Sequence, residues 1–236
     1  MSKTPAPSPG DAAPPPAPSP ARQRRKAERP QELLDAALAQ FVSKGLAATR
    51  MDDVARQAGV SKGTLYLYYP SKDELFKAVV RNSVVTVLTE GSDIVGRFEG
   101  PTSELLHILM HTWWSRIGSS KVSGIFKLVV ADVGNMPELA QFYLDEVITP
   151  THQLLSRAVA RGVARGEFRP INVMAVVQSM MAAAQFLMLY PYCAGSAPNN
   201  PFPLDADAFM KTQIELLLHG LEVRKPADAR PAKGQA

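Results

Sequence analysis

The chain has 236 residues, of which 46% are apolar, enough to bury one sizeable core or a small and a larger domain. Its single cysteine excludes an internal disulfide and suits a reducing compartment. The first twenty residues contain eight prolines and no apolar stretch typical of a signal peptide, and no run of about 18 apolar residues occurs. We therefore expect a soluble, cytoplasmic protein with no membrane-spanning segment.

The formal net charge of +4 is unevenly distributed along the chain. Residues 1–80 contain 12 Lys and Arg against 8 Asp and Glu, whereas residues 81–236 contain 14 of each. The excess is densest in ARQRRKAER, residues 21–29, where five cations accompany a single glutamate. Such a cluster suits a polyanion such as nucleic acid, but a solvated basic run is an equally good interpretation of these residues alone.

Residues 1–24 are predicted to be a disordered tail, because they hold too few large apolar side chains to offset the entropy of ordering. After them helical periodicity dominates, which predicts an all-α fold. In PQELLDAALAQFVSKG, residues 30–45, apolar side chains recur at helical spacing, with proline in the first turn and glycine at the end. MDDVARQAG, residues 51–59, predicts a shorter second helix that Gly59 closes.

The third predicted helix is short and has a stop signal at both ends. Gly59 supplies a left-handed turn residue before it, and Ser61 can cap it by accepting a backbone N–H bond. Pro70 disfavours helical geometry at the preceding residue, so the helix spans about six to eight residues. Ser71 then starts a fourth helix with SKDE, a capping box in which Glu74 reaches back to the cap residue. The tight turn between the second and third helices forms a helix-turn-helix pattern.

The residue types in the third helix suit contact with the major groove of DNA. Its first residues are small or extended, so its backbone can approach base edges, and Leu65 is expected to face inward. Gly63 costs roughly 1 kcal/mol of helix stability relative to alanine, which is reasonable if close approach is the gain. Phenolic hydroxyls, and a cation at the start of the next helix, can reach phosphates. The predicted contacts are Ser61, Lys62, Gly63, Thr64, Tyr66, Tyr68 and Lys72.

Taken alone, this spacing is structural about as often as it is functional. However, ATRMDDVARQAGVSKGTLYLYYPSKDELF, residues 48–76, closely resembles the N-terminal signature of the TetR family of transcriptional regulators. The resemblance implies that Thr49 and Arg50 enter the second helix close to phosphate, and that Lys72 holds the DNA backbone. Two residues depart from the family pattern. Arg50 replaces a hydroxyl with a guanidinium that can hold phosphate, and Leu67 stands where a polar or aromatic residue is common.

Residues 25–72 are accordingly expected to form a helix-turn-helix DNA-binding domain. Residues 73–224 are expected to form a larger helical domain for effector binding and dimerisation, giving about nine helices in all. Residues 225–236 are predicted to be a second disordered tail. Within the larger domain, Asn135 is expected to cap a helix that Pro150 kinks or splits.

The last two predicted helices, at about residues 172–190 and 205–223, are so apolar that most of their surface must be covered. Burial inside a single chain would cover them. A four-helix bundle with a second copy is the alternative that the resemblance implies and that a palindromic DNA site requires. We therefore expect a homodimer through these two helices, bound to double-stranded DNA.

The resemblance also implies a small effector in a cavity of the second domain, whose binding moves the fourth helix and separates the two recognition helices. Successive major grooves on one face of DNA lie about 34–36 Å apart, so a dimer with more widely separated helices cannot occupy both. An apolar, aromatic-rich lining suits a hydrophobic effector, although ordinary core packing is the commoner role for such residues. The candidate lining residues are Met110, Trp113, Trp114, Phe126, Tyr143, Met181 and Gln185.

No catalytic motif is evident in the sequence. His107 and His111 lie one helical turn apart, but a third metal ligand is lacking. Cys193 has no neighbouring histidine or cation to activate it as a nucleophile, although a redox-sensing thiol remains an alternative. We predict no catalytic residue, no metal and no cofactor.

These patterns and the resemblance together predict a dimeric transcriptional regulator. We expect a repressor that binds a palindromic operator and that a small hydrophobic effector releases. Two alternatives stay open. One is an all-helical ligand-binding or enzymatic domain whose basic end binds a partner other than DNA, and the other is a DNA-binding protein that responds to no ligand.

Overall fold

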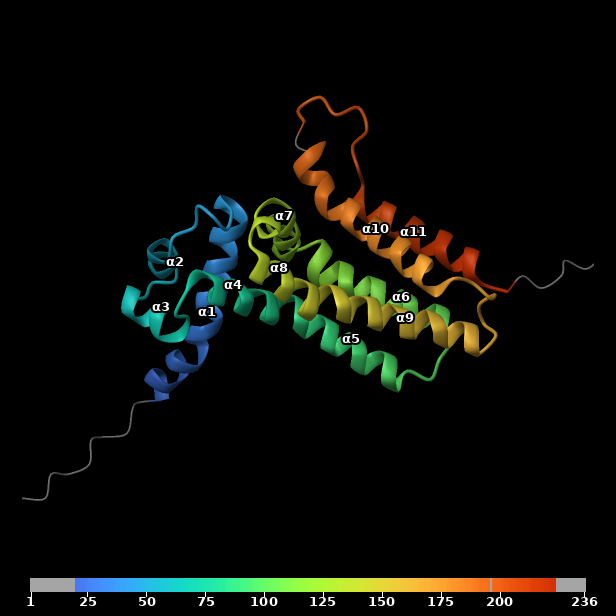
Figure 1. Cartoon of the computed structure of the whole chain (residues 1–236), viewed down its shortest axis with the longest axis horizontal. Coiled ribbons are helices and arrows are strands. Elements are labelled where there is room, and N and C mark those ends of the chain that lie inside the picture. Colours follow the sequence, from blue (N-terminus) through green and yellow to red (C-terminus); the bar gives the residue numbers. More distant parts are fainter. Residues whose placement is uncertain (1–19, 196, 224–236) are drawn as a thin grey trace, which may run out of the picture.

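The computed structural model describes residues 20–195 and 197–223, and every regular element in these ranges is helical (Figure 1). π turns join α4 to α5 and α8 to α9, and a third extends α6, so the described residues contain nine continuous helices. The prediction of an all-α fold is confirmed. The α-helical elements are α1 (Pro20–Lys44), α2 (Met51–Gln57), α3 (Lys62–Tyr68), α4 (Lys72–Val80), α5 (Thr86–Arg97), α6 (Thr102–Trp113), α7 (Gly124–Ala131), α8 (Pro137–Tyr143), α9 (Thr149–Ala164), α10 (Val173–Cys193) and α11 (Ala206–Leu221).

Helix α1 begins earlier than the sequence predicts. It starts at Pro20, so residues 20–24, assigned above to the disordered tail, are helical. Proline favours the first turn of a helix, and the Ala, Gln, Arg and Lys residues that follow are strong helix formers, which explains the extension. Pro30 consequently lies inside the helix instead of in its first turn, where it removes one backbone hydrogen bond. The predictions for residues 1–19 and 225–236 lie outside the described residues.

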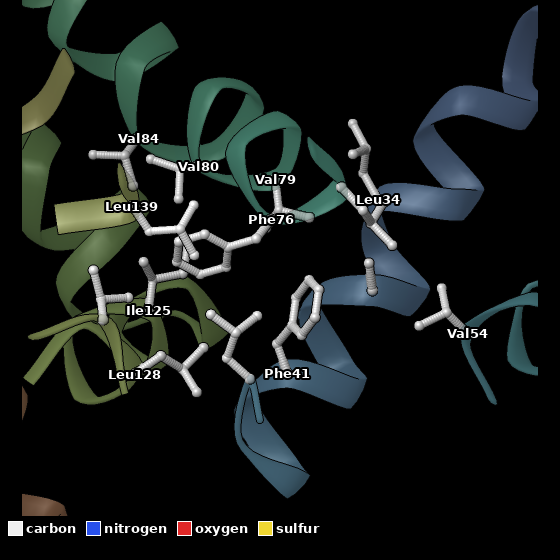
Figure 2. Close-up of a cluster of buried hydrophobic side chains, with 14 of the residues drawn as sticks. Leu34, Phe41, Val54, Phe76, Val79, Val80, Val84, Ile125, Leu128 and Leu139 are labelled. Carbon is white, nitrogen blue, oxygen red and sulfur yellow. The ribbon is translucent and has the colours of Figure 1, made fainter. Parts of the chain in front are cut away.

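The helix-turn-helix shares one hydrophobic core with the start of the second domain (Figure 2). Phe41 of α1 and Phe76 of α4 meet edge to face, with ring centroids 5.8 Å apart. Leu128 of α7 and Leu139 of α8 lie on the side of these rings that faces the second domain. All four side chains are fully buried, so the helix-turn-helix is anchored on α7 and α8 through close packing.

A second core fills the space between the long helices of the larger domain. Leu105 and Leu106 of α6, Val159 of α9 and Val177 of α10 are all buried in it. In Figure 1, α5, α6 and α9 run side by side, and α10 and α11 form an outer layer on the side of α6 and α9 away from α5. The larger domain is thus a bundle whose last two helices lie at its surface.

The helix that contains Pro150 changes its hydrogen-bond pattern without a gap. A π turn, Leu144–Ile148, joins α8 to α9, and Pro150 lies in the first turn of α9. Because proline has no N–H to donate to the preceding turn, the hydrogen-bond pattern changes just before it. The prediction that Asn135 caps this helix is wrong. Asn135 ends a short 3-10 turn, and Met136 occupies the cap position of α8 without a side-chain hydrogen bond.

Helix α10 is long and apolar enough to cross a membrane, judged by length and composition alone, with a mean hydropathy of 1.6. One such helix is only a weak sign of a membrane segment, because core helices of folded domains pass the same test. This helix packs against α7 and α9, but only 22% of its most apolar window is buried within the chain. Most of its apolar surface is therefore left exposed by the single chain.

Candidate DNA-binding surface and effector cavity

The turn between α2 and α3 has the geometry that the sequence predicts. Gly59 adopts a φ of +66°, in the left-handed region where side chains are strained. Ser61 caps α3, since its hydroxyl accepts the Thr64 N–H at 3.1 Å. At the other end, Tyr69 leaves the helical region before Pro70, and Leu65 is completely buried beneath the helix. Helix α3 thus has seven residues, and the buried Leu65 anchors its inner face.

The outer face of α3 is exposed over the predicted DNA contacts. Ser61, Lys62 and Gly63 are exposed, and Tyr66 keeps 40% of its surface accessible. A Cβ added at Gly63 would meet only the Ser61 hydroxyl, at 3.9 Å, so nothing inside the chain requires glycine there. Tyr68 is half-buried beside Tyr69, with ring centroids 6.4 Å apart.

Lys62, the first residue of α3, forms an ion pair with α2. Its Nζ lies 2.8 Å from the Asp52 carboxylate and 5.8 Å from the centroid of the Tyr66 ring. The hydrogen bond to Asp52 raises the pKa of Lys62, so the cation is retained at neutral pH. Exposed ion pairs of this kind are screened by water and contribute little to stability, so Lys62 can exchange Asp52 for another anion at little cost.

Two residues that are predicted to contact phosphate, Thr49 and Arg50, lie in the loop that joins α1 to α2. Arg50 occupies the cap position of α2 and is exposed, with a side chain that makes no cap hydrogen bond. Thr49, in contrast, is only 3% exposed, and its hydroxyl donates to the Gly45 carbonyl at 2.7 Å. Thr49 therefore closes the loop and presents no free hydroxyl to a phosphate.

Lys72 lies at the start of α4 and contacts the same loop. Its Nζ donates to the carbonyl of Ala47 at 2.9 Å and stays partly exposed. Ser71 caps α4 by accepting the Glu74 N–H, as predicted, but the other half of the capping box is absent. The Glu74 carboxylate pairs instead with Lys77, at 2.8 Å. The charge of Lys72 thus adds to the positive end of α4 on the surface next to α3.

A cavity of about 150 Å³ opens inside the larger domain, between α5, α6, α7, α9 and α10. Six of the seven predicted lining residues border it. They are Met110, Trp113, Phe126, Tyr143, Met181 and Gln185.

Trp114 is the exception. It begins a π turn, Trp114–Gly118, and its indole N–H donates to the Asp207 carboxylate at 2.6 Å, at the start of α11. The prediction that Trp114 lines the cavity is therefore wrong, although its ring lies next to that of Trp113, with centroids 6.1 Å apart.

One wall of the cavity, supplied by α9 and the helix that contains α5, was not predicted from the sequence. This wall includes Val84, Val87 and Gly91 from the fourth continuous helix and Leu154 from α9. The signal was present in the valine-rich pattern, since residues 84, 87 and 91 recur at helical spacing on one face. Five methionines also line the cavity, namely Met110, Met180, Met181, Met188 and Met210.

The chemistry of the cavity is apolar and neutral. No charged residue is among its described lining residues, whose polar side chains are Thr112, Trp113, Tyr143, Thr151 and Gln185. Burial raises the pKa of Tyr143 to about 12, so its phenol is neutral at physiological pH. The hydroxyl of Thr151 already donates to the Val147 carbonyl at 2.6 Å. A neutral, largely hydrophobic molecule fits such a lining best.

Large apolar side chains are exposed on α10 and α11, which correspond to the two helices predicted for dimerisation at about residues 172–190 and 205–223. Met174 and Phe186 of α10 and Leu216 of α11 face solvent in the single chain, Leu216 with 63% of its surface accessible. Within the part of the chain that the structure describes, no three His, Cys, Asp or Glu side chains gather as metal ligands, and Cys193 is exposed.

Comparison with known proteins extends over both parts of the chain. Residues 33–79 match the family model of bacterial regulatory proteins of the tetR family, and residues 104–216 match that of the C-terminal domain of AefR-like transcriptional repressors. The HTH-type transcriptional repressor KstR2 of Mycolicibacterium smegmatis is 22% identical over 195 residues, 83% of this chain and 91% of that protein. The uncharacterised HTH-type regulator YfiR of Bacillus subtilis is 28% identical over 157 residues, 64% of this chain and 74% of that protein.

The fold is likewise similar to that of solved transcriptional regulators. The crystal structure of the transcriptional regulator FadR from Bacillus subtilis in complex with stearoyl-CoA superimposes with a TM-score of 0.67 at 19% identity. The superposition covers 80% of this chain and 98% of FadR. With family models matched at both the helix-turn-helix and the helical domain that follows, the chain is a member of the TetR family of bacterial regulatory proteins.

Proposed function

We propose that this protein is a cytoplasmic repressor that binds a palindromic operator as a homodimer and that a small, neutral, hydrophobic effector releases it. The observation that carries the proposal is the pairing of two features in one chain. One is a short, capped third helix with an exposed, small-residue N-terminus, and the other is a neutral apolar cavity in the domain on which that helix is anchored.

The DNA contacts follow from the exposed face of α3. Ser61, Gly63 and Thr64 approach base edges in the major groove, while Lys62 exchanges Asp52 for a phosphate. Tyr66 presents its hydroxyl beside them, and Tyr68 contributes the exposed part of its ring. Arg50 and Lys72 bind the phosphate backbone on either side, since both lie at the N-termini of helices.

Dimerisation through α10 and α11 is supported by the apolar side chains that these helices expose in the single chain. A twofold pairing of the two helices with their copies buries these side chains and places two recognition helices in a symmetric arrangement. Such a dimer matches a palindrome whose half-sites are one helical turn apart.

The effector site is the cavity bordered by Phe126, Tyr143 and Gln185. An apolar cavity of about this volume, engineered in another protein, binds a molecule of the size of benzene, so a larger effector requires the surrounding helices to separate. FadR, which shares the fold, holds stearoyl-CoA, a ligand with a long apolar chain. The separation of helices is the step that couples effector binding to DNA release.

The test is a DNA-binding titration with operator fragments selected by the protein from its host genome. We expect a dissociation constant between about 10⁻⁸ and 10⁻¹¹ M at physiological salt and a steep loss of affinity as salt increases. Tyr66→Phe should weaken binding modestly and Tyr66→Ala more strongly, with unchanged thermal stability. Binding that is equally tight to scrambled fragments, or insensitive to both substitutions, would contradict the proposal.

A further inference from the structure

Helix α7 lies between the cavity and the helix-turn-helix. Ile125 and Phe126, in its first turn, border the cavity. Ile125 and Leu128 also belong to the core that contains Phe41 of α1, as Figure 2 shows. One short helix therefore forms part of the cavity wall and part of the surface on which α1 packs. Because protein interiors are close-packed, a displacement of the cavity wall is passed on to α1.

Both ends of α7 are fixed to α1 or to the loop that follows it. At the start, a Cβ added to Gly124 would lie 2.6 Å from Cγ1 of Val42, so the backbone of α7 touches α1 directly. At the end, the Asp132 carboxylate accepts the N–H of Leu46 at 2.7 Å. Gly45 has a φ of +88°, and a Cβ there would lie 3.4 Å from the same carboxylate oxygen. The chain between α1 and α2 is thus turned towards Asp132.

The loop that donates this hydrogen bond also contacts the start of α4. We call residues 45–50 the α1–α2 loop. Lys72 of α4 donates to the carbonyl of Ala47, one residue from the N–H that Asp132 accepts. Thr49 closes the loop on Gly45, and the Leu46 side chain is completely buried. The Leu46 N–H of this loop therefore contacts the larger domain, and the Ala47 carbonyl contacts the start of α4.

We propose that Asp132 is a positioning residue that transmits occupancy of the cavity to the helix-turn-helix, through its hydrogen bond to the α1–α2 loop. An effector that displaces Ile125 and Phe126 moves the end of α7, and the Leu46 N–H moves with the carboxylate. The α1–α2 loop then carries α2 and the Lys72 contact along. The inference rests on the proposed function, and it adds a route through α7 to the movement of the fourth helix.

The hydrogen bond itself is tested by amide hydrogen exchange at Leu46. Asp132→Ala removes the acceptor, whereas Asp132→Asn keeps an oxygen that can accept the same N–H, and both variants lose the charge. We expect the Leu46 amide to exchange at least about tenfold faster in Asp132→Ala than in Asp132→Asn. Equal exchange rates in these two variants would overturn the proposal.

Transmission is tested with a substitution that imitates an effector, because the natural effector is unidentified. Ala184 borders the cavity from α10, and Ala184→Phe places a ring in it. Since coupling between sites spans about 5- to 150-fold in affinity, we expect Ala184→Phe to weaken operator binding at least about tenfold in the otherwise native protein and with Asp132→Asn. With Asp132→Ala the same substitution should weaken it less than about threefold, which a double-mutant cycle quantifies.

Two controls separate coupling from damage. Thr112→Phe fills the cavity from α6 and must repeat the pattern, because Ala184 lies on a helix proposed for dimerisation. Asp145→Ala removes an exposed carboxylate from the turn between α8 and α9, and must leave the response of the native protein unchanged. Thermal unfolding and sedimentation establish that each variant is folded and dimeric.

The outcomes distinguish this inference from the proposed function. If cavity filling weakens operator binding equally in the native background and in the Asp132→Asn and Asp132→Ala backgrounds, the route through Asp132 is wrong while the ligand-responsive repressor stands. If neither filling substitution changes operator affinity in a folded dimer, the effector response fails, and the inference fails with it.

Discussion

Gly63 is a residue that the packing of the fold does not require. It lies in the first turn of α3, where glycine weakens a helix, and an added Cβ would meet no atom closer than 3.9 Å. Nothing within the described chain thus explains the glycine. Close approach of the α3 backbone to a DNA surface does explain it, and a substitution can test this directly.

We predict that Gly63→Ala stabilises the protein while weakening operator binding. The free energy of unfolding should rise by about 0.5 kcal/mol, because alanine loses less backbone entropy on folding. Operator affinity should fall about tenfold, since an extra methyl group in a packed interface costs about 1–3 kcal/mol. Thermal unfolding and fluorescence anisotropy measure the two effects. Gly96→Ala in α5, where an added Cβ also meets nothing within 4 Å, is the matched control and should leave DNA binding unchanged.

Residue identity was enough to predict the ends of α3, because their causes are local. Gly59, Ser61 and Pro70 each act through their own backbone geometry or a neighbouring N–H group. The same reasoning failed at Thr49 and Trp114. Thr49 is buried, with its hydroxyl 3.2 Å from the Gln40 carbonyl of α1, and the Trp114 indole donates to Asp207, 93 residues along the chain. Such long-range causes leave no mark in a short stretch of sequence.

At the scale of elements, α10 and α11 carry the proposed dimer interface. Their apolar pattern was evident in the sequence, but the pattern alone left burial within one chain as an alternative. The structure shows α10 packed on one side against α7 and α9 while large apolar side chains of both helices stay exposed. The inner faces of these helices pack within the single chain, and their outer faces are the surface proposed for the dimer.

We predict that Leu216→Glu converts the dimer to a monomer. A charge buried in the proposed apolar interface must be desolvated without a partner, which costs several kcal/mol. Sedimentation velocity should show the monomer, and operator affinity should fall at least about a hundredfold, because the two half-sites are then bound separately. Leu144→Glu, on an exposed turn of the α8–α9 helix, is the control. A dimer that survives Leu216→Glu would exclude α11 from the interface.

At the scale of the whole molecule, the helix-turn-helix and the larger helical domain share one hydrophobic core. The core around Phe41 and Phe76 is completed by Ile125, Leu128 and Leu139 from the second domain. Sequence comparison places these groups in separate family models, at residues 33–79 and 104–216. The shared core was not predictable from the sequence, because helical periodicity shows which face of a helix is apolar but not which helix covers it.

We predict that both parts unfold together. Leu128→Ala should lower the free energy of unfolding by about 2–5 kcal/mol, because it opens a cavity in the shared core. Both tryptophans of the chain lie at the end of α6, so their fluorescence reports on the effector domain, while operator binding reports on the helix-turn-helix. The two signals should be lost at the same urea concentration. Loss of operator binding well before the fluorescence change would show that the helix-turn-helix unfolds independently.

The methionines around the cavity have a consequence for the evolution of the regulator. Five unbranched thioether chains, on α6, α10 and α11, border the cavity. Such side chains repack around molecules of different outline with little rotamer strain. Related regulators that inherit this wall should acquire new inducers through one or two exchanges at the polar positions Thr112 and Gln185, without rebuilding the surrounding helices. Specificity would then diverge quickly among paralogues while the shared scaffold stays the same.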